Sequence, residues 1–143
     1  MTTEKYLRQI KKLNKMIDNR LNEIDRWHEM AENVSSKRFV ADLVQSSGVQ
    51  DRLGIIVAKI VDAESEVDRL VDMYVEKKST IIKQIESMEY KEYVVFYGKF
   101  IDEKPIADIA DELECTTRQV SRYYRSGLID FEEKYGEFYK NVV

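Results

Sequence analysis

The chain has 143 residues, of which 43% are apolar and 35% charged, and its formal net charge is −4. With 5 Gly and 1 Pro it has few helix breakers, so the composition favours long helices and excludes collagen, Pro-rich linkers and a loop-rich β-sandwich. A single Cys excludes an internal disulfide framework, and a single His argues against a His-built metal site. The negative net charge gives no overall attraction to nucleic acid, so DNA binding would have to come from a local patch.

No apolar run of the chain approaches the length of a membrane span, and the first residues lack the apolar core of a secretory signal. We therefore expect an all-α, soluble, cytoplasmic protein without a membrane partner. Apolar side chains on residues 3 to 32 recur at steps of three and four, which predicts one long amphipathic helix. They are Tyr6, Ile10, Leu13, Ile17, Leu21, Ile24 and Ala31, with Trp27 beside the stripe. The period breaks over about 33–50, where Ser and Gly residues indicate a connector.

A second long helix is predicted from about residue 50 to 87, again with apolar residues at three-four steps. The stripe comprises Leu53, Val57, Ile60, Val67, Val71, Tyr74, Ile81, Ile85 and Met88. Glu64 and Lys78 interrupt this stripe, and polar residues on a helix seam can set register and partner number. The alternative is that the seam rolls to the neighbouring stripe of Ile56, Ala63 and Leu70.

Two amphipathic helices of this length must each bury an apolar stripe. We therefore predict that residues 1–87 form a long antiparallel hairpin. One hairpin hides only part of the apolar surface, so this arm is also expected to mediate homo-oligomer formation, most simply as a dimer.

Residues 88–143 are predicted to form a small C-terminal helix-turn-helix domain. Ser87 is the expected N-cap of a third helix, Met88 to Ile101, whose aromatic residues are interpreted as core rather than as base-stacking groups. An apolar stripe of Leu128, Phe131, Tyr135 and Phe138 is expected to pack the tail onto that helix or onto a second chain.

The segment after Pro105 carries the packing pattern of a helix-turn-helix. Small and apolar residues stand where two short helices would cross a tight turn, at Ile109, Ala110, Leu113, Cys115, Val120 and Tyr123. Thr116 followed by Gln119 is a capping box, so the second helix should begin there. Glu114 stands where many such motifs have Gly, because that residue often takes a positive φ.

The second helix of this motif has a basic face. Between Cys115 and Ile129 there are three Arg and no acidic residue, which places positive charge where a recognition helix would meet DNA. The candidate DNA-binding residues are Thr116, Thr117, Arg118, Gln119, Ser121, Arg122 and Arg125. Arg and Gln can read guanine and adenine, whereas Ser and Thr suit phosphates. The alternative is a basic helix end that contacts only solvent and nearby Glu.

The long helices followed by the segment IADIADELECTTRQVSRYYR resemble small phage and prophage proteins of Gram-positive bacteria, over about residues 50 to 130. These are similar to late-gene transcriptional regulators of the ArpU type, with a C-terminal part that resembles the promoter-reading helix-turn-helix of bacterial sigma factors. The resemblance implies a regulator that binds double-stranded DNA in the bacterial host cell, with host RNA polymerase as a further partner.

The leading hypothesis is thus a sequence-specific DNA-binding regulator of phage transcription. Two alternatives remain open: a DNA-packaging recognition subunit similar to small terminases, and a coiled-coil adaptor that does not bind DNA. An enzyme is not expected, and neither is a cofactor or a metal. Cys115 occupies an apolar packing position, and the carboxylates of Asp108, Asp111 and Glu112 form a solvated helix face.

Overall fold

The computed structural model describes residues 1–41 and 47–142, with the side chains of residues 1–35, 48 and 50–142. All regular elements in these ranges are helices, which confirms the predicted all-α fold. The α-helices are α1 (Thr3–Leu7), α2 (Gln9–Ala41), α3 (Ser47–Glu86), α4 (Tyr90–Phe96), α5 (Ile106–Glu112) and α6 (Thr117–Tyr135). Two short elements complete the fold, a π-helix η1 (Tyr97–Ile101) and a 3₁₀-helix η2 (Gly136–Phe138).

The chain divides into two compact units. We call Asn14–Met73 the hairpin unit, and Met1–Leu13 together with Tyr74–Val143 the head unit. The predicted domain boundary at residue 87 falls inside the head unit, because Tyr6 and Ile10 of the first helices and Ile81 and Ile85 of α3 belong to the head core.

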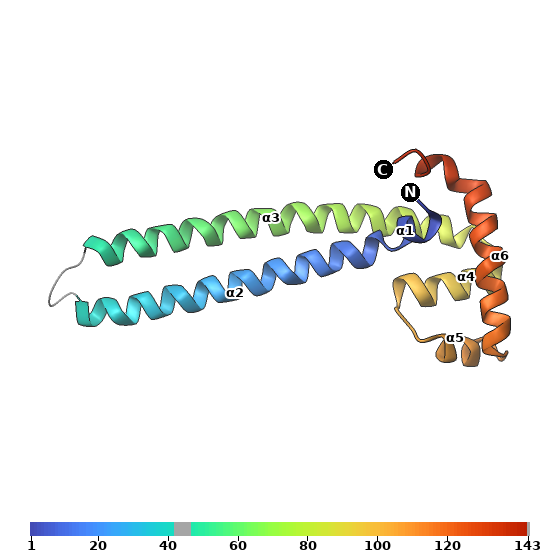
Figure 1. Ribbon diagram of the computed structural model, residues 1–143, viewed down its shortest axis with the longest axis horizontal. Helices are drawn as coiled ribbons and strands as arrows, with labels where there is room; N and C mark the ends of the chain where they lie inside the picture. The colour runs from blue at the N-terminus through green and yellow to red at the C-terminus, as the bar shows by residue number, and fades with distance from the viewer. Residues whose placement is uncertain (42–46, 143) are drawn as a thin grey trace. The chain divides into compact units, whose positions relative to one another are not determined.

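In the hairpin unit, α2 and α3 run antiparallel and lie side by side (Figure 1). Both helices extend into the predicted connector 33–50, because Ser lowers the stability of a helix only slightly. Residues 42–46 of that connector lie outside the described residues. Ile56, Ala63 and Leu70 are buried, whereas Val57 is 49% exposed and Glu64 lies in solvent. The seam of α3 in this unit therefore combines these three residues of the neighbouring stripe with Ile60 of the first stripe, so the second interpretation holds for most of its positions.

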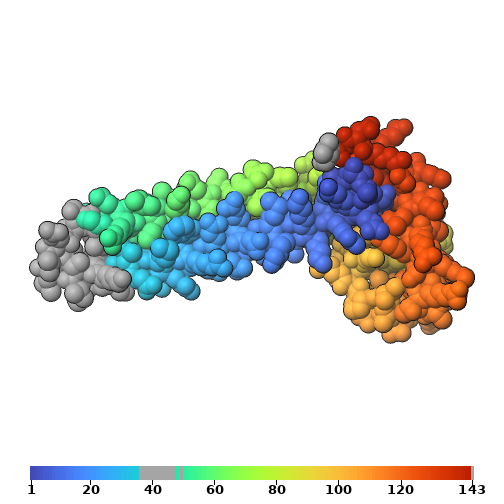
Figure 2. All heavy atoms as spheres, in the orientation of Figure 1, coloured from blue at the N-terminus to red at the C-terminus, as the bar shows by residue number. Residues whose placement is uncertain are grey.

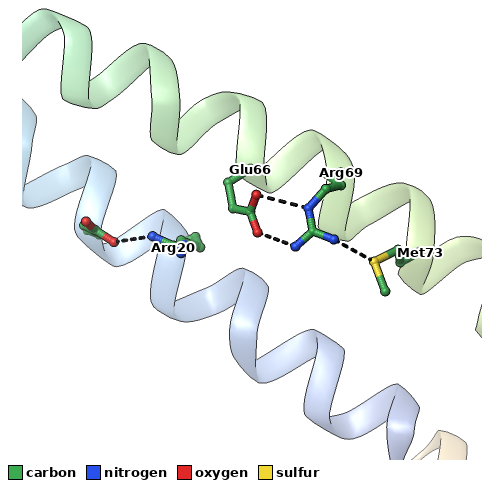
Figure 3. A network of polar contacts seen from close by, with 5 residues as sticks. Arg20, Glu66, Arg69 and Met73 are labelled. Carbon is green, nitrogen blue, oxygen red and sulfur yellow. Dashed lines mark hydrogen bonds and ion pairs between the residues drawn. The ribbon is translucent and has the colours of Figure 1, made fainter.

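On α2 the predicted stripe is buried except at Leu21 and at Ala31, which is half-buried. Ile17 and Ile24 are buried, but Leu21 is 45% exposed. The charged faces carry pairs within one helix, such as Arg20 Nη1 to Glu23 Oε2 at 3.1 Å and the bidentate pair of Arg69 with Glu66 (Figure 3). The side chains of these pairs lie largely in solvent.

The head unit is organised around one aromatic and aliphatic core. The Tyr6 and Tyr139 rings stack with centroids 4.5 Å apart, and the buried Thr3 and Tyr139 hydroxyl oxygens lie 2.8 Å apart in a hydrogen bond. The Tyr6 hydroxyl donates to Gln84 Oε1 at 2.7 Å. In Figure 2 the first residues, in dark blue, accordingly lie against the C-terminal segment, in red.

Two predictions for the start of the C-terminal part were wrong. Ser87 does not cap the third helix; its hydroxyl donates to the Gln84 carbonyl at 2.6 Å and lies 2.7 Å from the Tyr135 hydroxyl. The third helix begins at Tyr90, which is 70% exposed, and it changes to π-helical geometry from Tyr97.

In the tail, Tyr139 fills the core position expected for Phe138, which is exposed.

None of the described helices combines the length and the apolar content that a membrane span requires.

Candidate nucleic-acid interface

The first helix of the predicted motif, α5, is short and packs through two residues, Ile109 and Ala110. Pro105 is the N-cap of α5. After α5 the Cys115 N–H donates to the Ala110 carbonyl at 3.0 Å, which closes a tight turn. Glu114 within this turn has φ 53°, the left-handed conformation for which Gly is usual, so the turn geometry predicted from the sequence is confirmed.

The second helix, α6, begins with the predicted capping box. Thr116 Oγ1 accepts a hydrogen bond from the Gln119 N–H at 3.2 Å, and Gln119 Oε1 accepts one from the Thr116 N–H at 3.1 Å. These bonds satisfy backbone donors that the first turn of a helix otherwise leaves open. They also engage the amide oxygen of Gln119 and leave its NH₂ group to contact a ligand.

The packed side of α6 is defined by Val120, Gly127 and Phe131, all buried against the rest of the head unit. Arg118, Arg122 and Arg125 are exposed. At about 100° per residue these three arginines lie within a sector of roughly 60°, on the opposite side of the helix from Val120. We call them the arginine stripe.

The arginine stripe is not neutralised by neighbouring carboxylates. Among the side chains that the structure describes, no ion pair involves Arg118, Arg122 or Arg125, although Arg8, Arg20 and Arg69 all form such pairs. The acidic residues of α6 begin only at Asp130, so the helix is basic in its first half and acidic later. This arrangement can hold an anionic surface against the N-terminal half of α6.

The other predicted site residues divide into two groups. Thr116 and Thr117 are exposed at the start of α6, close to the arginine stripe in sequence. Ser121 was expected on the outward face, but it is half-buried and its hydroxyl donates to the Thr117 carbonyl at 3.2 Å. Cys115 is half-buried too, at the edge of the core rather than inside it.

A buried carboxylate of α4 forms a hydrogen bond with α6. Glu92 is buried, and its Oε1 accepts a hydrogen bond of 2.6 Å from the Ser126 hydroxyl. Burial raises the pKa of Glu92, the Ser126 hydrogen bond lowers it, and the carboxylates of Asp130 and Glu89 raise it. The sequence analysis missed this contact, because residues 34 positions apart give no local signal.

The sequence analysis also missed a group of four cationic side chains from separate segments. Arg8, Lys11, Lys99 and Lys104 line a cavity of about 340 Å³ in the head unit.

Comparison with protein-family models, curated proteins and solved structures gave no match to this chain.

Proposed function

We propose that this chain is a sequence-specific DNA-binding protein, which inserts the N-terminal half of α6 into the major groove. The observation that carries the proposal is the arginine stripe: Arg118, Arg122 and Arg125 project from the unpacked side of the second helix of a helix-turn-helix, without carboxylate partners in the described part of the chain. In this motif that helix reads base edges with its first turns.

The position along α6 suggests a division of roles. Arg118 and Arg122 lie in the first two turns and are assigned to base edges, since Arg pairs with guanine in the major groove. Arg125 lies a turn further on and is assigned to the phosphate backbone, as are Thr116 and Thr117 at the helix start. The free NH₂ group of Gln119 can donate to a base or a phosphate oxygen.

The resemblance to late-gene regulators of the ArpU type supports a role in phage transcription. The hairpin unit is assigned to self-association, because Leu21, Val57 and Val61 remain exposed beside its seam. A dimer would present two arginine stripes, and the DNA site would then consist of two related half-sites. Light scattering gives the number of subunits: a dimer fits the regulator, and a ring of eight or more subunits would favour DNA packaging instead.

The function is tested by selecting bound sequences from a random DNA pool and titrating the full-length protein with the selected duplex and a scrambled one. Arg122→Ala should lose roughly 1–3 kcal/mol on the selected duplex and relax the preference at one base pair. Arg125→Ala should weaken both duplexes about equally and lower the salt slope by about one unit.

Arg26→Ala is the matched control, because Arg26 is exposed in the hairpin unit and should not affect affinity. If the two α6 variants behave alike on both duplexes, the division of roles is wrong. If neither variant differs from the Arg26 control, or if wild type does not retain DNA at low salt, the DNA-binding proposal fails.

A further inference from the structure

A cavity of about 250 Å³ opens between α4, η1, α5 and α6 in the head unit. Its deep wall is apolar and consists of Val95, Ile109 and Val120, each at most 2% exposed. Ile106 and Tyr124 stand at its sides. Ser121, one of the candidate DNA-binding residues, also lines the cavity, whereas no residue of the arginine stripe does.

The second cavity in the head unit is the one of about 340 Å³ lined by Arg8, Lys11, Lys99 and Lys104. Glu103 contributes the one carboxylate of its lining, and its 3.8 Å contact with Lys11 is solvent-exposed and therefore weak. Lys104 Nζ also pairs with Glu112 Oε2 at 3.2 Å and with Asp102 Oδ2 at 3.8 Å, and Arg8 pairs with Glu4 at 3.6 Å. Lys99 is therefore the cation of this lining that forms no ion pair with a described residue.

The two cavities adjoin, because Lys99 and Lys104 line both of them. Together they fall within the roughly 300–1,000 Å³ that is typical of small-molecule sites. An apolar compartment therefore lies next to a polar one with charged walls, and two lysines stand at the border.

Tyr124 lines the apolar cavity and lies beneath the ammonium group of Lys99. The Tyr124 hydroxyl oxygen is buried, and Lys99 Nζ lies 3.8 Å from the centre of the Tyr124 ring. Burial raises the pKa of Tyr124, and the nearby Glu4 carboxylate raises it further, so the hydroxyl remains a donor at neutral pH. The Glu4 carboxylate is thus an acceptor close to this hydroxyl, so Tyr124 contributes its ring, with Lys99 above it, to the site.

We propose that the two cavities form one binding site for a small amphipathic anion, with an aromatic or branched apolar body and one carboxylate, sulfonate or phosphate group. The apolar body occupies the cavity against Val95, Ile109 and Val120, and the anionic group is held by Lys99 and Lys104. The site does not depend on DNA binding. Because α5 and α6 both line it, an occupant would fix the geometry between these two helices.

The test uses the full-length protein and anilinonaphthalene sulfonate, a fluorescent probe with an apolar body of naphthalene and phenyl rings and one sulfonate. Wild type should bind one probe per chain with a saturable fluorescence increase. The neutral analogue phenylnaphthylamine has the same apolar body without the sulfonate. It should bind about tenfold more weakly, which corresponds to about 1.4 kcal/mol.

Three variants locate the site. Lys104→Gln should weaken the sulfonate probe severalfold without changing the affinity for the neutral analogue. Ile106→Trp should weaken both probes, because Ile106 is 47% exposed and a larger ring there fills the cavity rather than the core. Lys12→Gln is the matched control, an exposed lysine outside both cavities, and should bind like wild type.

Thermal unfolding by circular dichroism verifies that each variant is folded. Probe binding that is equal in wild type, Lys104→Gln and Ile106→Trp would overturn the proposal. So would a neutral analogue that binds as tightly as the sulfonate, or the lack of saturable binding to folded wild type.

Discussion

Gly127 lies where α6 packs against the aromatic core of the head unit, and we predict that even one added methyl group there destabilises the protein. A Cβ at this position would lie 2.6 Å from Phe96 Cε1 and 3.2 Å from Met88 Cε. Phe96 is fully buried, and the rings of Phe100, Tyr124 and Phe131 lie 5.5 to 6.4 Å from its own, so its ring has no room to retreat.

The expected magnitude is the difference between two opposing effects. Overpacking a core costs about 1–3 kcal/mol, and a 2.6 Å contact with a confined ring belongs at the upper end of that range. Replacing Gly by Ala inside a helix returns about 1 kcal/mol. Gly127→Ala should therefore lower the free energy of unfolding by about 1–2 kcal/mol, and the melting temperature by roughly 3–8 °C.

Gly54→Ala is the matched control, because Gly54 lies inside α3 with nothing within 4 Å of its added Cβ. This substitution should raise the free energy of unfolding by up to about 1 kcal/mol. Urea unfolding followed by circular dichroism measures both changes. The packing argument is refuted if Gly127→Ala is as stable as wild type while Gly54→Ala is stabilised as expected.

A double-mutant cycle with Phe96→Leu then locates the clash. The smaller Leu removes the ring that the new methyl group contacts, so the two substitutions together should cost less than the sum of the single ones, by about 0.5–3 kcal/mol. Strict additivity would show that Phe96 is not the obstacle.

Three further predictions concern charge, capping and a buried hydrogen bond. Because the pKa of Glu92 is raised in the folded state, wild type should lose stability as pH rises above 4.5 towards that raised pKa. Glu92→Gln should lack this loss and should be more stable than wild type at neutral pH. Urea midpoints between about pH 4 and 8 measure the difference, and parallel pH profiles of the two proteins would contradict the prediction. Thr116→Ala should cost about 1 kcal/mol of stability with an unchanged ratio of affinities for selected and scrambled duplexes, whereas an altered ratio would make Thr116 a base-reading residue. Tyr6→Phe should lower the free energy of unfolding by about 1–3 kcal/mol, since it leaves the buried Gln84 Oε1 without its donor; an unchanged urea midpoint would contradict this.

The local signals in the sequence predicted the helix-turn-helix well. The Thr116–Gln119 capping box and the positive φ at Glu114 depend on residues within a few positions of each other, and both are present as expected. The predicted cap at Ser87 failed because its hydroxyl finds partners at Gln84 and Tyr135, and the second of these is brought close only by the packing of α6.

The choice between the two stripes of α3 also lay beyond local pattern. Val57 and Ile56 are both apolar and adjacent in sequence, and only the position of α2 decides which of them is buried.

The adjoining cavities in the head unit could not be predicted for a related reason. Arg8, Lys99 and Lys104 come from three segments, and their assembly depends on how these segments pack.

The contact between Thr3 and Tyr139 has a consequence for the order in which the chain folds during synthesis. These residues are 136 positions apart, and a ribosome that adds about 5–20 residues per second needs roughly 7–27 s to cover that distance. The hairpin unit contains mainly contacts between two consecutive helices, which form quickly, so it can fold within that interval. Tyr6 and Leu7 must wait for Phe131 and Tyr139 before they are covered. We therefore expect α1 to be the segment of the nascent chain that aggregation or chaperone capture affects most.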